Sequence, residues 1–401
     1  IQNREINLDG LEKEISESFS KKLLSYNNNW AKIEKMLKII TSQKFRKNFK
    51  DSFGKGFKYN WFIMDHVGFK NNPRKRDLGF SKIWNKYQKH YKKNNIKNID
   101  GFHFHHHPIP FSKSANHCAT HFFNSDPLIY QILNRRIIEN VWFPSTFRAG
   151  FHAIRPDSHW FLEQFIPFDF SNQSVTDEKD NFIDFKKGRL GDWRRATKSW
   201  EPYHPDHDDY QKKGKCRRWS ARCLNIGTRG RLLRTKDIEQ AFKETARGKS
   251  AVLSFTNHDY RDMQDDISNV YKMIKSVSKK YPKVKFKWSE AREAMRKSIN
   301  IKINKKANIK QKFIGNILHI KSDQPIFGPQ PYLSIKTSKN QYFHDNFDIQ
   351  RPFYEWTYTL DEQTIPMNDL KVLGWAANDK FGRTYISIYK HNKRKFKINL
   401  I

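Results

Sequence analysis

The fold is indicated first by residues 99–108, which have the sequence IDGFHFHHHP. Over 99–105 aromatic side chains alternate with others, a pattern typical of a strand. Upstream, the apolar run 59–64 predicts a buried strand, and the stretch 79–91 has the apolar spacing of a helix. A strand, a helix and a second strand in this order are typical of a parallel β-α-β unit.

The same alternation continues over about 240 residues in all, which favours a parallel α/β domain or barrel. Further strands are expected at 141–147, 223–226, 251–256 and 284–288. Further helices are expected at 128–138, 237–247 and 263–279. The sequence therefore predicts an α/β fold whose largest unit is a (β/α) barrel over residues 55–298.

Two other regions flank this unit. Apolar residues at roughly helical spacing over 11–41 predict a helical N-terminal extension, residues 1–54. Beyond about residue 300 the helical period is lost, and short expected strands alternate with turns, at 313–320, 332–335, 355–360, 372–376 and 384–389. This pattern predicts an antiparallel β-sandwich domain over residues 299–401.

The composition excludes several classes of protein. Of the 401 residues, 37% are hydrophobic and 15% aromatic, which is too many for a disordered chain. No run of about eighteen uncharged apolar residues occurs, so we expect no membrane-spanning helix. The sparse cysteines, Cys118, Cys216 and Cys223, form no CxxC pair and favour a reducing compartment. We expect a cytoplasmic protein, although a chain that begins at Ile1 leaves room for a preceding segment.

The chain is strongly basic, with 76 Lys and Arg against 41 Asp and Glu, which gives a formal net charge of +35. Such a charge is compatible with nucleic acid, an anionic membrane surface or an anionic polymer. The basic residues are spread along the sequence, and no RRM, KH or helix-turn-helix signature accompanies them. Nucleic-acid binding is therefore the less favoured class, a biased Lys-, Asn- and Ile-rich composition is the plainer explanation, and peripheral contact with an anionic membrane stays open.

Four histidines in five positions follow the expected strand. Alternation along an extended chain places His103, His105 and His107 on one side. Neutral imidazoles are common ligands of zinc and related divalent ions, and a carboxylate would complete such a site. The alternative is a solvated or stacked histidine cluster. The sequence predicts a bound divalent metal, zinc above others.

Three further residues come at or just after expected strands. Asp65 follows the strand 59–64, Arg148 follows 141–147, and His258 follows 251–256. In α/β barrels the functional groups lie at these carboxyl ends of the strands. A strand-end Asp alone is weak evidence, because it often only caps the next helix.

In this order of motifs, residues 55–295 resemble the polysaccharide deacetylases, the NodB-homology fold of carbohydrate esterase family 4. The resemblance rests on motif order, and it implies that the barrel is NodB-like. It implies a metal triad of Asp65, His103 and His107, in which Phe104 stands where the family has Ser or Thr and His105 is an alternative ligand. It also implies that Arg148 orients the catalytic carboxylate, that His258 is the general acid, and that Asp192 orients His258.

The first motif departs from the family pattern. The family has two adjacent aspartates, one the base and one a metal ligand, whereas this chain has Met64, Asp65 and His66. Either Asp65 is the ligand and Met64 replaces the base, or Asp65 is the base and His66 binds the metal. The first arrangement weakens or abolishes hydrolysis, and the second preserves it.

The expected activity is removal of an N-acetyl group from an amino sugar of a polysaccharide or glycoconjugate. A metal-activated water attacks the amide, a carboxylate takes its proton, and His258 protonates the leaving amine. An inactive relative that binds glycan in the same groove is the alternative that Met64 favours. Expected substrate-binding residues come from aromatic and polar runs after strands, and they are Trp193, Tyr203, Asn257, Asp259 and Arg261.

Overall fold

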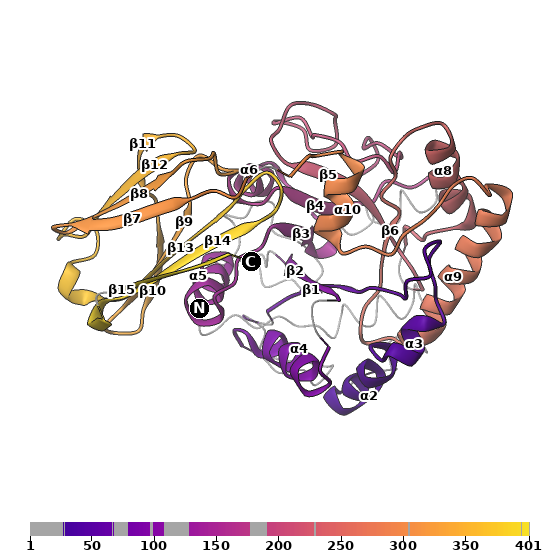
Figure 1. Cartoon of the computed structure of the whole chain (residues 1–401), viewed down its shortest axis with the longest axis horizontal. Coiled ribbons are helices and arrows are strands. Elements are labelled where there is room, and N and C mark those ends of the chain that lie inside the picture. The colour runs from indigo at the N-terminus through magenta and orange to yellow at the C-terminus, as the bar shows by residue number, and fades with distance from the viewer. Residues whose placement is uncertain are drawn as a thin grey trace.

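The computed structural model describes residues 27, 29–65, 67, 79–96, 99–107, 128–176, 191–227, 230–303, 305–393 and 395–400. A curled sheet of six parallel strands, together with its helices and loops, forms the larger part of the described chain (Figure 1). Its strands follow one another in chain order: β1 (Asn60–Ile63), β2 (Gly101–His106), β3 (Thr146–Ala149), β4 (Phe168–Asn172), β5 (Trp219–Asn225) and β6 (Ser254–Thr256). The α/β class expected from the sequence is confirmed, and the sheet closes only part of a barrel.

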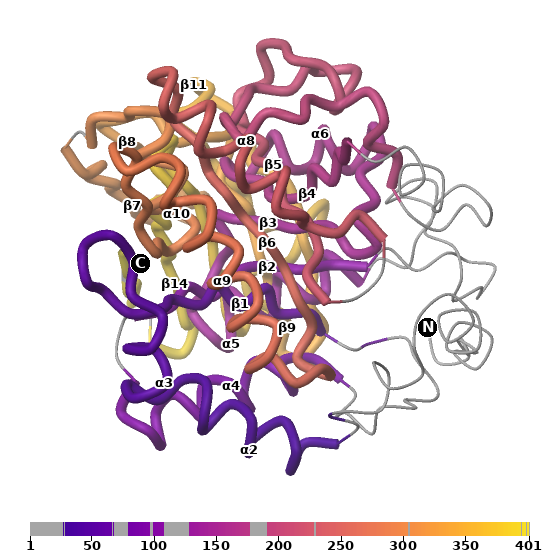
Figure 2. Tube along the Cα trace, turned by 90° about the vertical axis from the view of Figure 1, so that its right-hand side faces the viewer, coloured from indigo at the N-terminus to yellow at the C-terminus, as the bar shows by residue number. Residues whose placement is uncertain are grey.

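Helices cover the outer face of this sheet (Figures 1 and 2). They are α2 (Trp30–Ile40), α3 (Gln43–Lys47), α4 (Lys82–Lys93), α5 (Leu128–Asn140), α6 (Pro156–Phe165), α8 (Thr235–Ala246) and α9 (Met263–Lys280), whereas α10 (Ala291–Ser298) lies on the inner side. In α9, Ile267, Val270, Ile274 and Val277 are buried at helical spacing, and the Asp262 side chain caps the first turn. Within the described residues, none of these helices is long and apolar enough to cross a bilayer.

Part of the expected N-terminal extension belongs to the barrel itself. Helix α2 packs on α4 and α9, and its buried residues Ile33 and Leu37 share one core with theirs. The part of the extension before residue 27 lies outside the described residues.

Alternation along β1 and β2 decides which side chains face the inside of the sheet. The Phe62 ring contacts the His103 and Phe170 rings on the inner face. Trp61 instead points outward and contacts Tyr87 of α4. Because successive strand residues point to opposite faces, Met64 lies on the inner side with Phe62.

The sheet has a gap between its first and last strands. Strand β6 pairs with β5 and not with β1. Residues 284–288, expected as a strand, are extended but pair with no strand; Phe286 exchanges backbone and side-chain hydrogen bonds with Ser52 instead. Helix α10 closes the inner face, where Ala291 and Met295 share a core with Phe170.

Residues 309–400 form two antiparallel sheets. One has the order β10-β9-β13-β14-β15 and the other β11-β12-β8-β7. The strands are β7 (Ile309–Ile314), β8 (Ile317–Ser322), β9 (Tyr332–Thr337), β10 (Tyr342–Asp345), β11 (Asp348–Arg351), β12 (Glu355–Thr359), β13 (Leu370–Asn378), β14 (Thr384–Lys390) and β15 (Lys395–Leu400). Both sheets contribute to one core, in which Trp356 and Trp375 are buried. The segment 313–320, expected as one strand, is the hairpin of β7 and β8, which turns at Gly315 with φ of 59°.

Helix α5 joins the two parts of the molecule, because β9, β10 and β13 pack on it. Gly374 of β13 allows this approach: a Cβ there would lie 2.8 Å from Cγ2 of Ile137 in α5. The expected strand 141–147 is displaced for a related reason. Helix α5 runs to Asn140, Val141 follows with φ of 50°, and the strand begins only at Thr146.

Candidate functional site

A cavity of about 1110 Å³ lies on the inner side of the half-barrel and extends into the gap between β1 and β6. At the carboxyl ends of the strands it is lined by Met64, His105, His107, Arg148, Asn257 and His258. This is the edge at which parallel α/β barrels carry their functional groups. The cavity therefore gathers residues from β1, β2, β3 and β6 at one edge.

His105 and His107 form the closest pair in this part of the cavity. Both point to one side, as alternation at the end of β2 predicts, and their Nε2 atoms lie 3.0 Å apart. The Nδ1 atom of His105 lies 2.6 Å from the carbonyl oxygen of Arg148, and the His107 ring packs on Phe151. When Nδ1–H of His105 donates to that carbonyl, its Nε2 lone pair points toward His107.

This pair has features of a metal site. A metal-bound imidazole usually donates its other N–H to a backbone carbonyl or carboxylate, as His105 does to Arg148. Two nitrogen ligands of one tetrahedral zinc lie about 3.3 Å apart, close to the separation of the two Nε2 atoms. Across the described ranges, however, no three His, Cys, Asp or Glu side chains are grouped so as to hold an ion. The pair thus offers two imidazole nitrogens and no third group, and His66, the alternative ligand, lies outside the described residues.

Asp65 is held by residues of the helical layer, although it lines a small second pocket together with His107. Its carboxylate accepts a hydrogen bond from Nη2 of Arg136 at 2.7 Å and from the backbone N–H of Ser81 at 3.2 Å. Burial raises the pKa of Asp65, and the Arg136 guanidinium opposes that rise. Since Asp65 follows Met64, and Met64 lines the cavity, alternation turns the carboxylate toward α4 and α5.

His103 lies deeper in the half-barrel. Its Nε2 atom is 3.0 Å from Oδ1 of Asn60 and 3.3 Å from Oε1 of Glu290, at the amino-terminal end of β1. Burial lowers the pKa of His103 to about 4, although Glu290 opposes the shift. A strand rises about 3.3 Å per residue, so His103 and His107 are roughly 13 Å apart along the chain. The structure therefore places His103 away from His107, whereas Asp65 and His107 line one small pocket.

The segment after β6 brings polar groups to the same cavity. His258 lines it, and its ring stacks on Tyr260. Asp259 accepts a hydrogen bond from the hydroxyl of Tyr87 at 2.8 Å, and Asn257 donates to Asp266 at 2.6 Å. Asp259 is the one carboxylate among the described lining residues.

Arg148 also lines the cavity. Its Nη2 atom lies 2.9 Å from Nδ1 of His152, while its carbonyl accepts from His105. Arg148, which lies within β3, therefore contacts His105 through its backbone and also lines the cavity.

Besides Asp65 and His103, four of the expected site residues are not among the residues that line the cavity. Asp192 pairs with Arg194 at 3.2 Å, not with His258. The Trp193 indole is buried, and its N–H donates to the carbonyl of His152. Trp193 therefore packs in the interior of its loop, whereas Asp192 forms a partly exposed ion pair.

The side chains of Tyr203 and Arg261 also form contacts outside the cavity. The Tyr203 hydroxyl donates to the carbonyl of Tyr210 at 3.1 Å, and burial raises the pKa of Tyr203 well above its usual range. Arg261 forms a bidentate ion pair with Asp266, in which Nε lies 2.8 Å from Oδ2 and Nη2 lies 3.0 Å from Oδ1. The aromatic loop around residue 203 thus contributes none of the described lining residues.

Two contributors to the cavity wall were not predicted from the sequence. Tyr87 was one apolar position in an expected helix, and nothing in its spacing marks the hydroxyl bond to Asp259. Phe151 has φ of 50°, which bends the chain after β3 so that its ring reaches His107. The neighbouring Gly150 was a possible signal, since a Cβ there would lie 2.3 Å from the His107 ring.

Comparisons with known proteins add little. No protein-family model matches the chain, and no curated protein matches it. Among solved structures, an alpha-toxin of Clostridium perfringens from an avian strain is weakly similar, with 12% identity and a TM-score of 0.13. The matched part covers 41% of this chain and 48% of the toxin, so the chain spans about half the toxin's length. A likeness this weak carries no argument about fold or function.

Proposed function

We propose that the protein is a metal-dependent hydrolase that removes an N-acetyl group from an amino sugar, as the resemblance to polysaccharide deacetylases implies. The observation that carries the proposal is the His105–His107 pair, whose Nε2 atoms converge on the wall of a large cavity. The resemblance supplies the reaction, and what supports it in the structure is that two imidazole nitrogens and His258 line the cavity at one edge of the half-barrel.

In this proposal His105 and His107 hold a divalent ion, zinc above others, through Nε2. Such an ion, when bound, polarises the amide carbonyl and lowers the pKa of a bound water. Further ligands come from His66 or from Asp65 after rotation away from Arg136, the two alternatives that the first motif leaves open. The hydrogen bond from His105 to the carbonyl of Arg148 orients the ring toward the ion.

The chain's own acid and base then complete the hydrolysis. Asp259, as the carboxylate on the described cavity wall, accepts the proton of the attacking water. The C–N bond breaks as the new C–O bond forms, and His258 donates a proton to the leaving amine. The products are acetate and a free amino sugar in a polymer or glycoconjugate.

An inactive glycan-binding relative is the second candidate, and Met64 favours it. Its thioether lines the cavity at the position where the family has a carboxylate, and the adjacent Asp65 is paired with Arg136. Such a protein would bind the same acetylated sugars without releasing acetate.

The first experiment measures metal content by mass spectrometry in the purified full chain and in His105→Ala and His107→Ala. We expect about one equivalent of zinc or a related ion in the wild type and loss of most of it in either variant, since each removes one ligand. His258→Ala should keep its metal and release acetate from N-acetylated oligosaccharides at least about a hundredfold more slowly.

His207→Ala is the matched control, because His207 is an exposed histidine whose Nδ1 pairs with Glu163 outside the cavity. Full metal retention in both cavity variants would refute the ligand pair. Metal binding without acetate release from any acetylated oligosaccharide, together with saturable binding of those sugars, would favour the inactive relative.

A further inference from the structure

The same cavity reaches the surface at the opposite edge of the sheet, outside the candidate active site, where several of its lining side chains are exposed. Lys55 and Lys58 line it just before β1 begins, and Lys249 lines it before β6. In a parallel sheet these amino-terminal ends share one edge, and six strand residues separate the edges by roughly 20 Å. The opening, called here the lysine mouth, consists of Phe53, Lys55, Lys58, Lys249, Lys285, Lys287 and Lys297.

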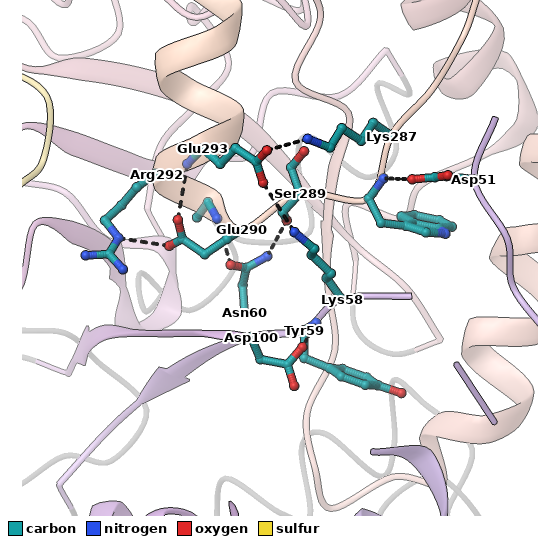
Figure 3. A network of polar contacts seen from close by, with 12 residues as sticks. Asp51, Lys58, Tyr59, Asn60, Asp100, Lys287, Ser289, Glu290, Arg292 and Glu293 are labelled. Atoms are coloured by element: carbon teal, nitrogen blue, oxygen red, sulfur yellow. Dashed lines mark hydrogen bonds and ion pairs between the residues drawn. The ribbon is translucent and has the colours of Figure 1, made fainter. Parts of the chain in front are cut away.

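Positive charge at the lysine mouth exceeds what its carboxylates neutralise. Glu293 pairs with both Lys58 and Lys287, and Figure 3 shows these two lysines converging on it. The exposed pair Lys249–Glu201 is 3.5 Å long.

Lys55, Lys285 and Lys297 are exposed and form no ion pair with any carboxylate in the described part of the chain. The two other acidic residues at this edge form hydrogen bonds with other groups. Asp51 accepts three backbone N–H bonds. Glu290 accepts a hydrogen bond from Arg292 (Figure 3). An anionic group would therefore find three cations here that no described carboxylate neutralises.

Behind the lysine mouth the wall is apolar. Phe57, Phe242, Leu253, Phe255, Ile274, Phe286 and Trp288 line this part of the cavity. Protein interiors are otherwise packed to about three quarters of their volume, so empty space beside these apolar side chains forgoes many dispersion contacts. The whole cavity, at about 1110 Å³, slightly exceeds the roughly 300–1,000 Å³ typical of ligand pockets.

We propose that the lysine mouth and the apolar wall behind it bind one long-chain fatty acid anion. The carboxylate would lie among Lys55, Lys285 and Lys297, and the chain would fill the space between β1 and β6. A sugar polymer or nucleic acid needs polar partners along its length, which this wall does not offer. Phe53, 62% exposed beside Lys55, would cover the first methylene groups.

The test titrates the full chain with the fluorescent fatty acid cis-parinaric acid below its micelle concentration and then displaces it with palmitate. We expect saturable binding of one molecule. The double variant Lys55→Glu/Lys285→Glu should bind about tenfold more weakly, and Leu253→Trp, which fills the apolar space, should abolish binding. Palmityl alcohol should bind the wild type and the double variant with equal affinity, since it lacks the carboxylate.

Lys310→Glu/Lys339→Glu is the matched control, because it changes the net charge equally at exposed positions of the two antiparallel sheets. If both double variants weaken fatty acid binding equally, the effect is one of overall net charge, and the proposed site is overturned. The site is also overturned if the wild type binds anionic vesicles but not the monomeric fatty acid, or if folded Leu253→Trp, checked by its thermal unfolding, binds as well as the wild type. None of these outcomes depends on metal or acetate release.

Discussion

His159 is a buried histidine whose hydrogen bonds fix it in the neutral form. Its Nε2 atom lies 2.7 Å from the carbonyl of Asp206, and Nε of Arg218 donates to its Nδ1 at 3.0 Å. A protonated Nδ1 could not accept this hydrogen bond, and its positive charge would be repelled by the guanidinium. Burial, and then Arg218, lower the pKa of His159 to about 3.

This shift predicts loss of stability in acid. Above pH 6.5 His159 is neutral in both states; between pH 6.5 and about 3 only the unfolded chain binds the proton. The free energy of unfolding should therefore fall as the pH falls through this range, by about 1.4 kcal/mol per pH unit from this group. Urea unfolding at pH 7, 6, 5 and 4 should give a shallower dependence for His159→Gln. The control His319→Gln, in strand β8 of the antiparallel sheets, should follow the wild type; unchanged slopes in both variants would contradict the assignment.

The candidate site was partly predictable at the level of residues. Alternation places His105 and His107 together, because the period of a strand is fixed whatever surrounds it. The same rule places Met64 and Asp65 on opposite faces, but only the packed helices decide which face is the inner one. The ion pair with Arg136, 71 positions away in the chain, is a long-range contact that no local pattern carries.

Helix α10 is the element that closes the inner face of the half-barrel. Asn60 fixes its first turn, since Oδ1 accepts from the backbone N–H of Ala291 at 2.8 Å, while Nδ2 donates to Ser289 (Figure 3). Met295, fully buried, is its main apolar contact with the inner core.

Truncation of that contact should destabilise the fold. Met295→Ala leaves a cavity among packed side chains, and we expect a loss of about 2–5 kcal/mol in the free energy of unfolding by urea. Lys297→Ala, on the exposed side of the same helix, should change it by less than about 0.5 kcal/mol. Equal effects of the two changes would show that α10 does not close the core.

Elements with apolar surroundings were predictable and those with polar ones were not. Strand β1 and helix α9 follow plain apolar patterns and lie near the expected ranges. Strand β4 has the sequence FDFSN, in which buried Asp169 pairs with Arg218 at 3.2 Å in place of an apolar contact. Helix α10 has only two buried residues among eight, so nothing in its charged composition marks a core role.

The two parts of the molecule share buried polar contacts as well as apolar ones. Asn378 of β13 donates from Nδ2 to the carbonyls of Pro144, at 2.7 Å, and Phe165, at 2.8 Å. Both carbonyls belong to the half-barrel, and the packed sheet buries these bonds between the two parts. Unfolding of one part would leave these polar groups of the other part without their hydrogen-bond partners.

The whole chain should therefore unfold in one calorimetric transition. Asn378→Ala leaves both carbonyls without that donor and should lower the free energy of unfolding by about 3 kcal/mol, still in one transition. Asn308→Ala, with an exposed side chain, is the control. Two resolved transitions in the wild type would show that the parts are independent.

Exposed lysines lie along two edge strands of the antiparallel sheets. Strands β7 and β15 lie at open sheet edges, where unpaired backbone groups offer a template to another chain. Lys310 and Lys312 project from β7, and Lys395 and Lys397 from β15, all exposed. Two molecules meeting edge to edge would bring like charges together, and salt would weaken that repulsion. The basic composition thus keeps neighbouring copies from extending each other's sheets, a protection that fades as ionic strength rises.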